Sequence, residues 1–389
     1  MSDRKAFSLI NILRNMVSFY FDTFFAIYFF NLTNYEILPI AKYYLVVYLV
    51  IVLSFWLIRR SIHLSYKVYY YRIGISLMAL YLALIMLLKE NIASYIYVVA
   101  IIKGLSEGFY YYPRNVLNST KITNSERKHY EGIINAINQV SSILIPLLLG
   151  IFLTYYTYIQ IGKAVFVLMI VIFFLSFYVK EDKNDDKKRI KSWEFYQMIK
   201  EDKDVRNALL VQFLRGFTIT SGVLTAVITI YKILYFESNL YIGILNSVLG
   251  LLTCITCLVY AKNKNESLFK KVSILTMIFI SLCIIWLALK PSNIGFIIYL
   301  VIYAIGITVI SLKSDNITVN ASNLDVVKHH KSEYHLLLET VLGISRVSGY
   351  VLLLTVGLIG NSDLLKYLLV FSIIPLVLLV FELNRGYSE

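Results

Sequence analysis

Long apolar runs separated by short polar connections dominate the hydrophobic pattern of this 389-residue chain. Each run is about 20 residues long, the length of helix that crosses a hydrocarbon core of roughly 30 Å. The runs are continuous, so they indicate α-helices and not the alternating strands of a membrane barrel. We therefore predict an all-α membrane protein with twelve spans, near residues 7–30, 37–58, 68–88, 92–113, 131–154, 158–179, 205–231, 239–261, 270–289, 293–313, 333–358 and 364–384.

A polar stretch at residues 180–204 divides the predicted spans into two groups of six. We expect an N-terminal six-helix half (1–179), a cytoplasmic central loop (180–204) and a C-terminal six-helix half (205–389). An even number of spans in each half gives parallel repeats, related by an axis along the membrane normal. Short matches at an offset near 200 support such repeats, for example Leu13-Arg14 with Leu214-Arg215 and Arg114-Asn115 with Asp315-Asn316.

Composition and charge agree with membrane embedding and give an orientation. The chain is 58% hydrophobic and 16% charged, with a formal net charge of +13. The surplus lies in alternate loops, which the positive-inside rule places in the cytoplasm, so we expect a multi-pass protein of the cell membrane with cytoplasmic N- and C-termini. The same distribution gives no reason to expect nucleic acid as a partner. The basic residues are Arg59, Arg60, Lys67 and Arg72, then Lys121, Arg127 and Lys128, then Lys262, Lys264, Lys270 and Lys271, then Lys328 and Lys331.

Two local motifs carry a resemblance to a known family. The segment WLIRRSIHLSYKVYYYRIG has the basic residues and the closing Gly74 of a loop between spans two and three. The segment NQVSSILIPLLLG retains Pro146 and Gly150 of a span-five motif. With the six-plus-six pattern, the chain resembles the major facilitator superfamily. The run EGFYYYPRNVLNSTKITNSERKHYEG is similar to a poorly characterised low-GC Gram-positive branch of that family.

This resemblance implies a secondary transporter that works by alternating access, with substrate bound near the midplane between the halves. It also implies that spans one, four, seven and ten line the cavity. A transporter of this kind needs no cofactor, and we expect a monomer whose partners are a small-molecule or lipid substrate and membrane lipid.

Ionisable residues inside the spans are the main candidates for function, because each costs roughly 2.5–3.5 kcal/mol at the bilayer centre. Lys103 and Glu107 are one helical turn apart on one face of span four, and Lys103 lies about 16 Å from the outer end of the span. They form either a self-neutralising pair or a coupling carboxylate with its partner.

Further deep charges extend this set of candidates. Asp22, Arg215, Glu339 and Arg346 join Lys103 and Glu107 as candidate substrate or proton-coupling residues. The slight excess of deep cations favours an anionic or zwitterionic substrate. For three others we expect gate or cytoplasmic-end ion pairs: Arg14, Arg114 and Asp315.

Polar residues without charge give candidates for the cavity wall. They are Tyr111, Asn135, Asn138, Thr308 and Ser311, although interhelical hydrogen bonds would also explain the asparagines. The Cys254–Cys257 pair lies in an apolar run and is expected to pack there. All five histidines fall in predicted loops or at helix starts, so we expect no metal site and no catalytic residues.

The leading hypothesis is therefore a proton-coupled secondary transporter and not an enzyme. Two alternatives remain open: a flippase for a lipid or lipid-linked precursor on the same fold, and a receptor or partner protein that does not transport. The sequence has no GxxxxGK[ST] segment, which argues against ATP-driven transport by this chain alone.

Overall fold

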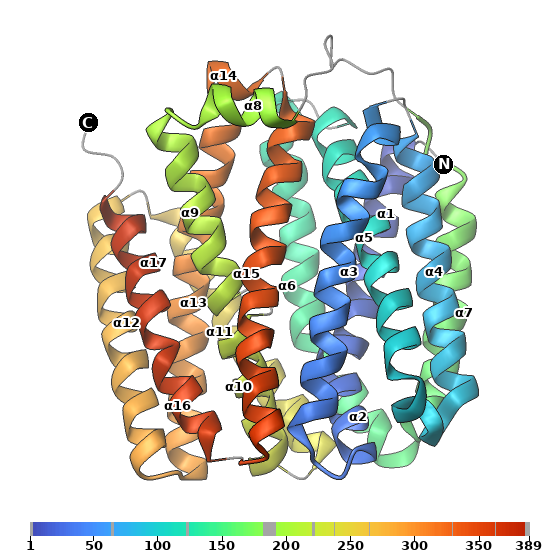
Figure 1. The fold of residues 1–389 in the computed structure, drawn as a ribbon, viewed down its shortest axis with the longest axis vertical. Coiled ribbons are helices and arrows are strands. Elements are labelled where there is room, and N and C mark those ends of the chain that lie inside the picture. Colours follow the sequence, from blue (N-terminus) through green and yellow to red (C-terminus); the bar gives the residue numbers. More distant parts are fainter. Residues whose placement is uncertain are drawn as a thin grey trace.

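A computed structural model describes residues 3–63, 66–121, 124–181, 192–219, 222–236, 238–263, 265–328, 330–361 and 363–385. These residues form a bundle of helices without strands. The long helices run along one common direction, and the two chain termini lie at the same end of the bundle (Figure 1). We call this the terminal end and the other the distal end.

The first part of the chain supplies the helices coloured blue to light green in Figure 1. Successive spans run in opposite directions, because the short connections turn the chain back at each end of the bundle. They are α1 (Asp3–Phe19), η1 (Tyr20–Phe25), α2 (Ala26–Leu32), α3 (Ile37–His63), α4 (Lys67–Leu88), η2 (Lys89–Tyr95), α5 (Ile96–Lys121), α6 (Asn124–Tyr155) and α7 (Tyr158–Ser176).

The second part of the chain begins with a short helix at the terminal end and continues with a second set of long helices (Figure 1). They are α8 (Ser192–Ile199), α9 (Lys203–Thr218), α10 (Val223–Tyr235), α11 (Asn239–Lys262), α12 (Glu266–Leu289), α13 (Asn293–Ser322), α14 (Asp325–Lys328), α15 (Lys331–Ile359), α16 (Leu364–Phe371) and α17 (Ile373–Arg385).

Among the described residues, nine helical stretches are long and apolar enough to cross a membrane. One of them, Lys67–Asn118, covers two predicted spans, because α4, η2 and α5 follow each other without an intervening coil. The predicted spans 7–30 and 205–231 are not among these stretches, because neither forms one helix that is both long and apolar enough. Both are helical along most of their length, but charged residues and a helix break interrupt them.

These two breaks occur about 200 residues apart. The first is η1, a π-helical segment that widens the turn between α1 and α2. The second separates α9 from α10, where Gly222 packs against the end of α9. A Cβ at Gly222 would lie only 2.2 Å from the carbonyl oxygen of Phe217, so a larger residue does not fit. Such interruptions of a spanning helix are common at functional sites in transporters.

The most extensive contacts between the earlier and later parts of the chain are those of α3 with α15 and of α6 with α11, and α5 also contacts α15. In the second pair the backbones meet closely, because a Cβ on Gly243 would lie 2.6 Å from the carbonyl oxygen of Pro146. In the first pair, Tyr350 of α15 stacks on both Tyr44 and Tyr48 of α3, at 5.3 Å between ring centroids in each case. Small residues and flat rings thus allow extensive contact between the two parts.

The terminal end of the α3–α15 pair is held by an ion pair. The Arg59 guanidinium donates to both carboxylate oxygens of Glu333, with Nε at 3.2 and 3.0 Å. Glu333 is 1% exposed, so the contact is shielded from solvent. A fork-shaped donor facing a carboxylate fixes the relative position of two helices better than a single hydrogen bond does.

Among the helices of the first part of the chain, two glycines of α5 allow α3 to pack closely against α5. A Cβ on Gly108 would lie 2.5 Å from the Ser54 Cβ, and one on Gly104 would lie 2.7 Å from the carbonyl oxygen of Val47.

We expect Gly108→Leu to force α3 and α5 apart and to destabilise the protein by about 1–3 kcal/mol, the usual cost of overpacking. The thermal unfolding midpoint of the detergent-solubilised protein, followed by tryptophan fluorescence, measures this effect.

The control for this prediction is Thr154→Leu, which adds a similar side chain at an exposed position near the end of α6. Its midpoint should stay at the wild-type value. An unchanged midpoint in Gly108→Leu would show that the α3–α5 contact is looser than the structure indicates.

Candidate functional site

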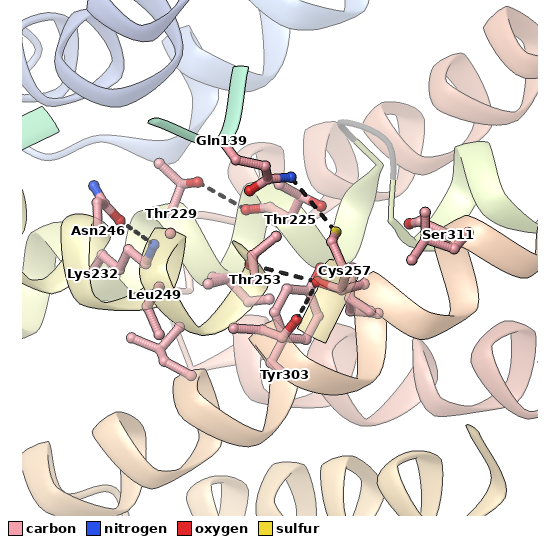
Figure 2. Close-up of a pocket in the computed structure, with 17 residues that line it drawn as sticks. Gln139, Thr225, Thr229, Lys232, Asn246, Leu249, Thr253, Cys257, Tyr303 and Ser311 are labelled. Atoms are coloured by element: carbon pink, nitrogen blue, oxygen red, sulfur yellow. Dashed lines mark hydrogen bonds between the residues drawn. The ribbon is translucent and has the colours of Figure 1, made fainter. Parts of the chain in front are cut away.

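A cavity of about 480 Å³ lies between α6, α10, α11 and α13 (Figure 2). We call it the inner cavity. One wall residue, Gln139, comes from α6, and the other wall residues come from the later part of the chain. The wall consists of Gln139, Thr225, Ile228, Thr229, Lys232, Asn246, Leu249, Gly250, Thr253, Cys257, Leu300, Tyr303, Ala304, Ile307, Thr308, Ser311 and Leu312.

The polar side chains of the inner cavity follow the helical period. On α10, Thr225, Thr229 and Lys232 are spaced i, i+4 and i+7, which places them on one face. On α13, Thr308 and Ser311 occupy adjacent turns of one face and reach the same cavity. Most of the other residues of α10 are apolar. A polar stripe on each helix therefore adds polar side chains to a cavity wall that also contains many apolar residues.

Hydrogen bonds fix part of this wall. The Lys232 ammonium donates to Asn246 Oδ1 at 2.8 Å, and Gln139 Nε2 donates to Cys257 Sγ at 3.6 Å (Figure 2). The other end of the same amide, Gln139 Oε1, is buried without a partner among the described residues. This leaves an acceptor for a ligand or water in the wall.

A second cavity, of about 560 Å³, lies nearer the terminal end, between α5, α9, α13 and α15. We call it the outer cavity. It is more polar than the inner one, because charged residues of both signs line it. Arg215 and Asp315 form an ion pair in its wall, and Asn115 Nδ2 donates to Glu339 Oε1 at 3.1 Å. The wall also includes Arg114, Asn118, Gln212, Thr318, Val319, Ser322, Lys331, His335, Leu338 and Leu342.

Helix α13 lines both cavities with one face. Thr308 and Ser311 belong to the inner cavity, whereas Asp315 and Thr318 belong to the outer one. The step from Ser311 to Asp315 is one helical turn, about 6 Å along the axis. The two cavities therefore follow each other along α13 from the bundle interior toward the terminal end.

A third feature is a charge cluster inside the first group of helices. Glu107 of α5 accepts a hydrogen bond at 2.8 Å from Arg14 Nη2 of α1 and forms a second ion pair with Lys103, one turn away on α5. Arg14 is 2% exposed and Glu107 is 7% exposed, so their contact is buried, whereas Lys103 is partly exposed. One carboxylate thus serves two cations.

Aromatic rings surround this cluster. The Lys103 ammonium lies 4.7 Å from the centroid of the Phe21 ring and 5.4 Å from that of Tyr81. The Arg14 guanidinium lies 5.1 Å from the centroid of the Tyr110 ring. The cluster has two cations and one carboxylate, and the electron-rich faces of these rings stabilise the excess positive charge. The cluster is thereby held as one unit and lies apart from the walls of the two cavities.

The remaining predicted residues lie in different parts of the structure: in the wall of the outer cavity, at the α3–α15 contact and against the apolar core. Asp315 pairs with Arg215 and not with Arg114, although all three line the outer cavity. Arg346 lies over the Tyr48 ring at the α3–α15 contact, 5.2 Å from its centroid. Tyr111 packs against the apolar core and belongs to neither of the two cavity walls as described.

Three predicted residues lie on α6 or η1. Asn138 Oδ1 accepts from Asn15 Nδ2 at 2.9 Å, which joins α6 to α1 as an interhelical hydrogen bond. Asp22 lies in η1 and Asn135 lies in α6, but their side chains fall outside the described part of the structure.

Sequence reasoning missed Lys232 and Asn246. Lys232 directly follows the predicted end of span seven, where a lysine is ordinarily interpreted as reaching the membrane surface. The i, i+4, i+7 stripe with Thr225 and Thr229 was the signal that could have revealed it, because it places the lysine on the polar face of an apolar helix.

The sequence profile of the Major Facilitator Superfamily matches residues 6–350. The chain belongs to this superfamily. Membership makes it a multi-pass membrane protein of a transporter family, as the motifs at Gly74 and Pro146 had suggested. No curated protein sequence matches the chain.

Solved transporters of this superfamily's fold resemble the whole chain. The nucleoside transporter NupG superposes with a TM-score of 0.66 at 13% identity, covering 100% of both chains. The human organic anion transporter MFSD10 gives 0.64 at 12% identity, covering 98% of this chain and 100% of the other. A bacterial homologue of the iron transporter ferroportin, in its inward-facing state, gives 0.63 at 13% identity with 99% and 98% coverage. At these identities the likeness shows the fold.

The charge cluster makes an ordered prediction about stability. Glu107→Gln leaves buried Arg14 and partly buried Lys103 without their carboxylate and should destabilise the protein by about 3–5 kcal/mol. Lys103→Met leaves the Arg14–Glu107 pair intact and should cost much less. Thermal unfolding of the two variants in the same detergent measures the order, and an equal loss in both, or a larger loss in Lys103→Met, would contradict the cluster as described.

Proposed function

We propose that this protein is a secondary active transporter that moves a small anionic or zwitterionic solute across the cytoplasmic membrane by alternating access. The observation that carries the proposal is the position of the two cavities. Each takes wall residues from both parts of the chain: Gln139 joins α10, α11 and α13 at the inner cavity, and α5 joins α9, α13 and α15 at the outer one. Relative movement of the two parts would therefore change access to both.

The proposed architecture has twelve spans in two six-helix halves, residues 1–179 and 205–389, with the central loop 180–204 between them. The breaks at η1 and before α10 support it, since they interrupt the first span of each half at equivalent positions. We also propose that the terminal end faces the cytoplasm. The basic loops that follow α3 and α11 support this orientation, because both loops lie at that end.

Movement between the halves would require the α3–α15 contact to open at one end at a time. The Arg59–Glu333 pair closes its terminal end, and the Tyr44–Tyr350 stack lies toward its distal end. The pair is shielded but lies near the membrane surface, where water can take over its hydrogen bonds when the helices separate. Alternating access needs a separate contact at each end of the helix pair, so that one end can open while the other stays closed.

For proton coupling we propose Glu339 as the principal residue. A coupling carboxylate needs contact with water and neighbours that it can exchange. Glu339 lines the outer cavity and is held by the neutral amide of Asn115, whereas Glu107 is enclosed by two cations. Arg215 and Asp315 face the same cavity and could exchange partners with Glu339 during the cycle.

The test is flux into proteoliposomes, using a panel of labelled organic anions, zwitterions and cations with and without an inwardly directed proton gradient. We expect gradient-driven accumulation of an anion or zwitterion by the wild type. Glu339→Gln should abolish the effect of the gradient and should retain exchange of solute for solute, because the cavity remains but its proton site does not.

Glu382→Gln is the matched control, since this carboxylate lies near the end of α17 and pairs locally with Arg385. It should accumulate solute like the wild type. Flux that ignores the gradient in the wild type would contradict proton coupling. Absence of carrier-mediated flux for every solute class would contradict the transporter itself and favour the receptor or partner protein.

A further inference from the structure

Lys232 is a cation in the wall of the inner cavity, and no carboxylate of that wall lies beside it. Arg215 is paired with Asp315, and Arg59 is paired with Glu333. The Lys232 ammonium instead donates to a neutral amide oxygen, Asn246 Oδ1, at 2.8 Å. Within the described part of the chain, no Asp or Glu oxygen lies within ion-pair distance of it, and the wall of the inner cavity contains no acidic residue.

The wall of the inner cavity gives this partly buried ammonium a neutral acceptor, Asn246, and no negative charge. Lys232 lies in the last turn of α10, and burial of an ammonium among apolar side chains costs free energy that a hydrogen bond to a neutral amide recovers only in part. Replacement by methionine would keep the length of the side chain and avoid the cost. An anion that enters the cavity would neutralise the ammonium and gain a charge-assisted hydrogen bond.

The amide beside Lys232 is oriented to assist an anion. Asn246 Oδ1 accepts from the ammonium, so its Nδ2 group is left with two N–H donors. Ammonium and amide together present donors of the kind that a carboxylate or sulfonate requires. A dianion would leave one negative charge unmatched, and a zwitterion would bring an ammonium group for which the wall has no carboxylate.

The other residues of the wall indicate what kind of ligand body fits the cavity. Ile228, Leu249 and Leu300 are apolar, whereas Thr229 and Thr253 offer hydroxyls. The cavity volume of about 480 Å³ is within the range of sites for single small molecules.

We infer that the inner cavity binds a small organic monoanion, with its charged group on Lys232 and Asn246 and a largely apolar body along α10 and α11. The inference rests on the proposed transport function and names the substrate class of that same site. It makes Lys232 the residue that selects for one negative charge.

A reporter thiol inside the cavity tests the charge preference without knowledge of the natural solute. Thr229→Cys, made in a protein with Cys254, Cys257 and Cys283 replaced by alanine, places this thiol one turn from Lys232 on the same face of α10. Its labelling rates are compared for two methanethiosulfonate reagents of similar size, the anionic sulfonatoethyl and the cationic trimethylammonioethyl reagent. The neutral methyl reagent serves as reference.

We expect the anionic reagent to react faster relative to the cationic one, and Lys232→Met to lower this ratio by about tenfold or more. One charge about 6 Å away changes the two rates in opposite directions, which gives about tenfold in the ratio even at the dielectric constant of water. Lys232→Arg should preserve the ratio. Lys163→Met is the matched control, because it removes an exposed lysine from α7, which contributes no residue to the described wall of the cavity. Its ratio should equal that of the unsubstituted protein.

A ratio that is equal for the two reagents, or unaffected by Lys232→Met, would overturn the inference, as would a thiol that none of the three reagents reaches. The outcome is separable from that of the transport assay. Flux of an organic monoanion that persists unchanged in Lys232→Met would overturn this assignment and leave the transporter standing. A clear charge preference without any carrier-mediated flux would support the site and contradict transport.

Discussion

The cost of placing a charge in hydrocarbon is the constraint on which the rest of this structure depends. Water and counter-ions are absent there, so each ionisable side chain must find a partner inside the protein or face a cavity. Glu107 illustrates the first solution, since it binds Arg14 and Lys103 and the Tyr110 and Phe21 rings take up the remaining positive charge. Lys232 illustrates the second, because its only hydrogen-bond acceptor among the described residues is an amide oxygen at a cavity wall.

Under the proposed mechanism, the two solutions mark a static and a variable region of the molecule. The Glu107 cluster lies among the helices of the earlier part of the chain, next to aromatic side chains. The partners of Glu107 are Lys103 of the same helix and Arg14 of α1. The two cavities lie where the earlier and later parts of the chain meet, and α13 connects them. Under the proposed mechanism, the cluster would keep one half rigid while the polar walls of the cavities change their exposure.

Much of the fold could be predicted from the sequence. The apolar runs predict where the long helices lie, although α5, α6 and α13 extend several residues beyond the predicted spans. The i, i+4 spacing of Lys103 and Glu107 is enough to predict their pairing. Arg14 is 93 residues from Glu107 in sequence, and no local rule brings the two together. The partner of Asp315 was unpredictable for the same reason, because Arg114 and Arg215 both reach the outer cavity and only packing decides between them.

The least predictable features are the helix breaks, because hydrophobicity averaged over a span does not register them. Thr225, Thr229 and Lys232 of α10, the helix that follows the second break, line the inner cavity. The predicted end of span seven excluded that lysine by one residue. Single-span reasoning treats a lysine near a helix end as a surface residue. Its place in the cavity wall depends on α6, α11 and α13, which belong to other parts of the sequence.

Alternating movement of the two halves is the central claim, and distance measurements between spin labels test it most directly. One label pair, Tyr66→Cys with Asn323→Cys, spans the halves at the terminal end, and a second, Glu36→Cys with Asn361→Cys, spans them at the distal end. In a protein whose native cysteines are replaced, both pairs are measured in lipid nanodiscs at pH 6 and pH 8. The account predicts that the distance at one end increases as the distance at the other decreases. Distances that stay constant at both ends, or that change in the same direction, would contradict it.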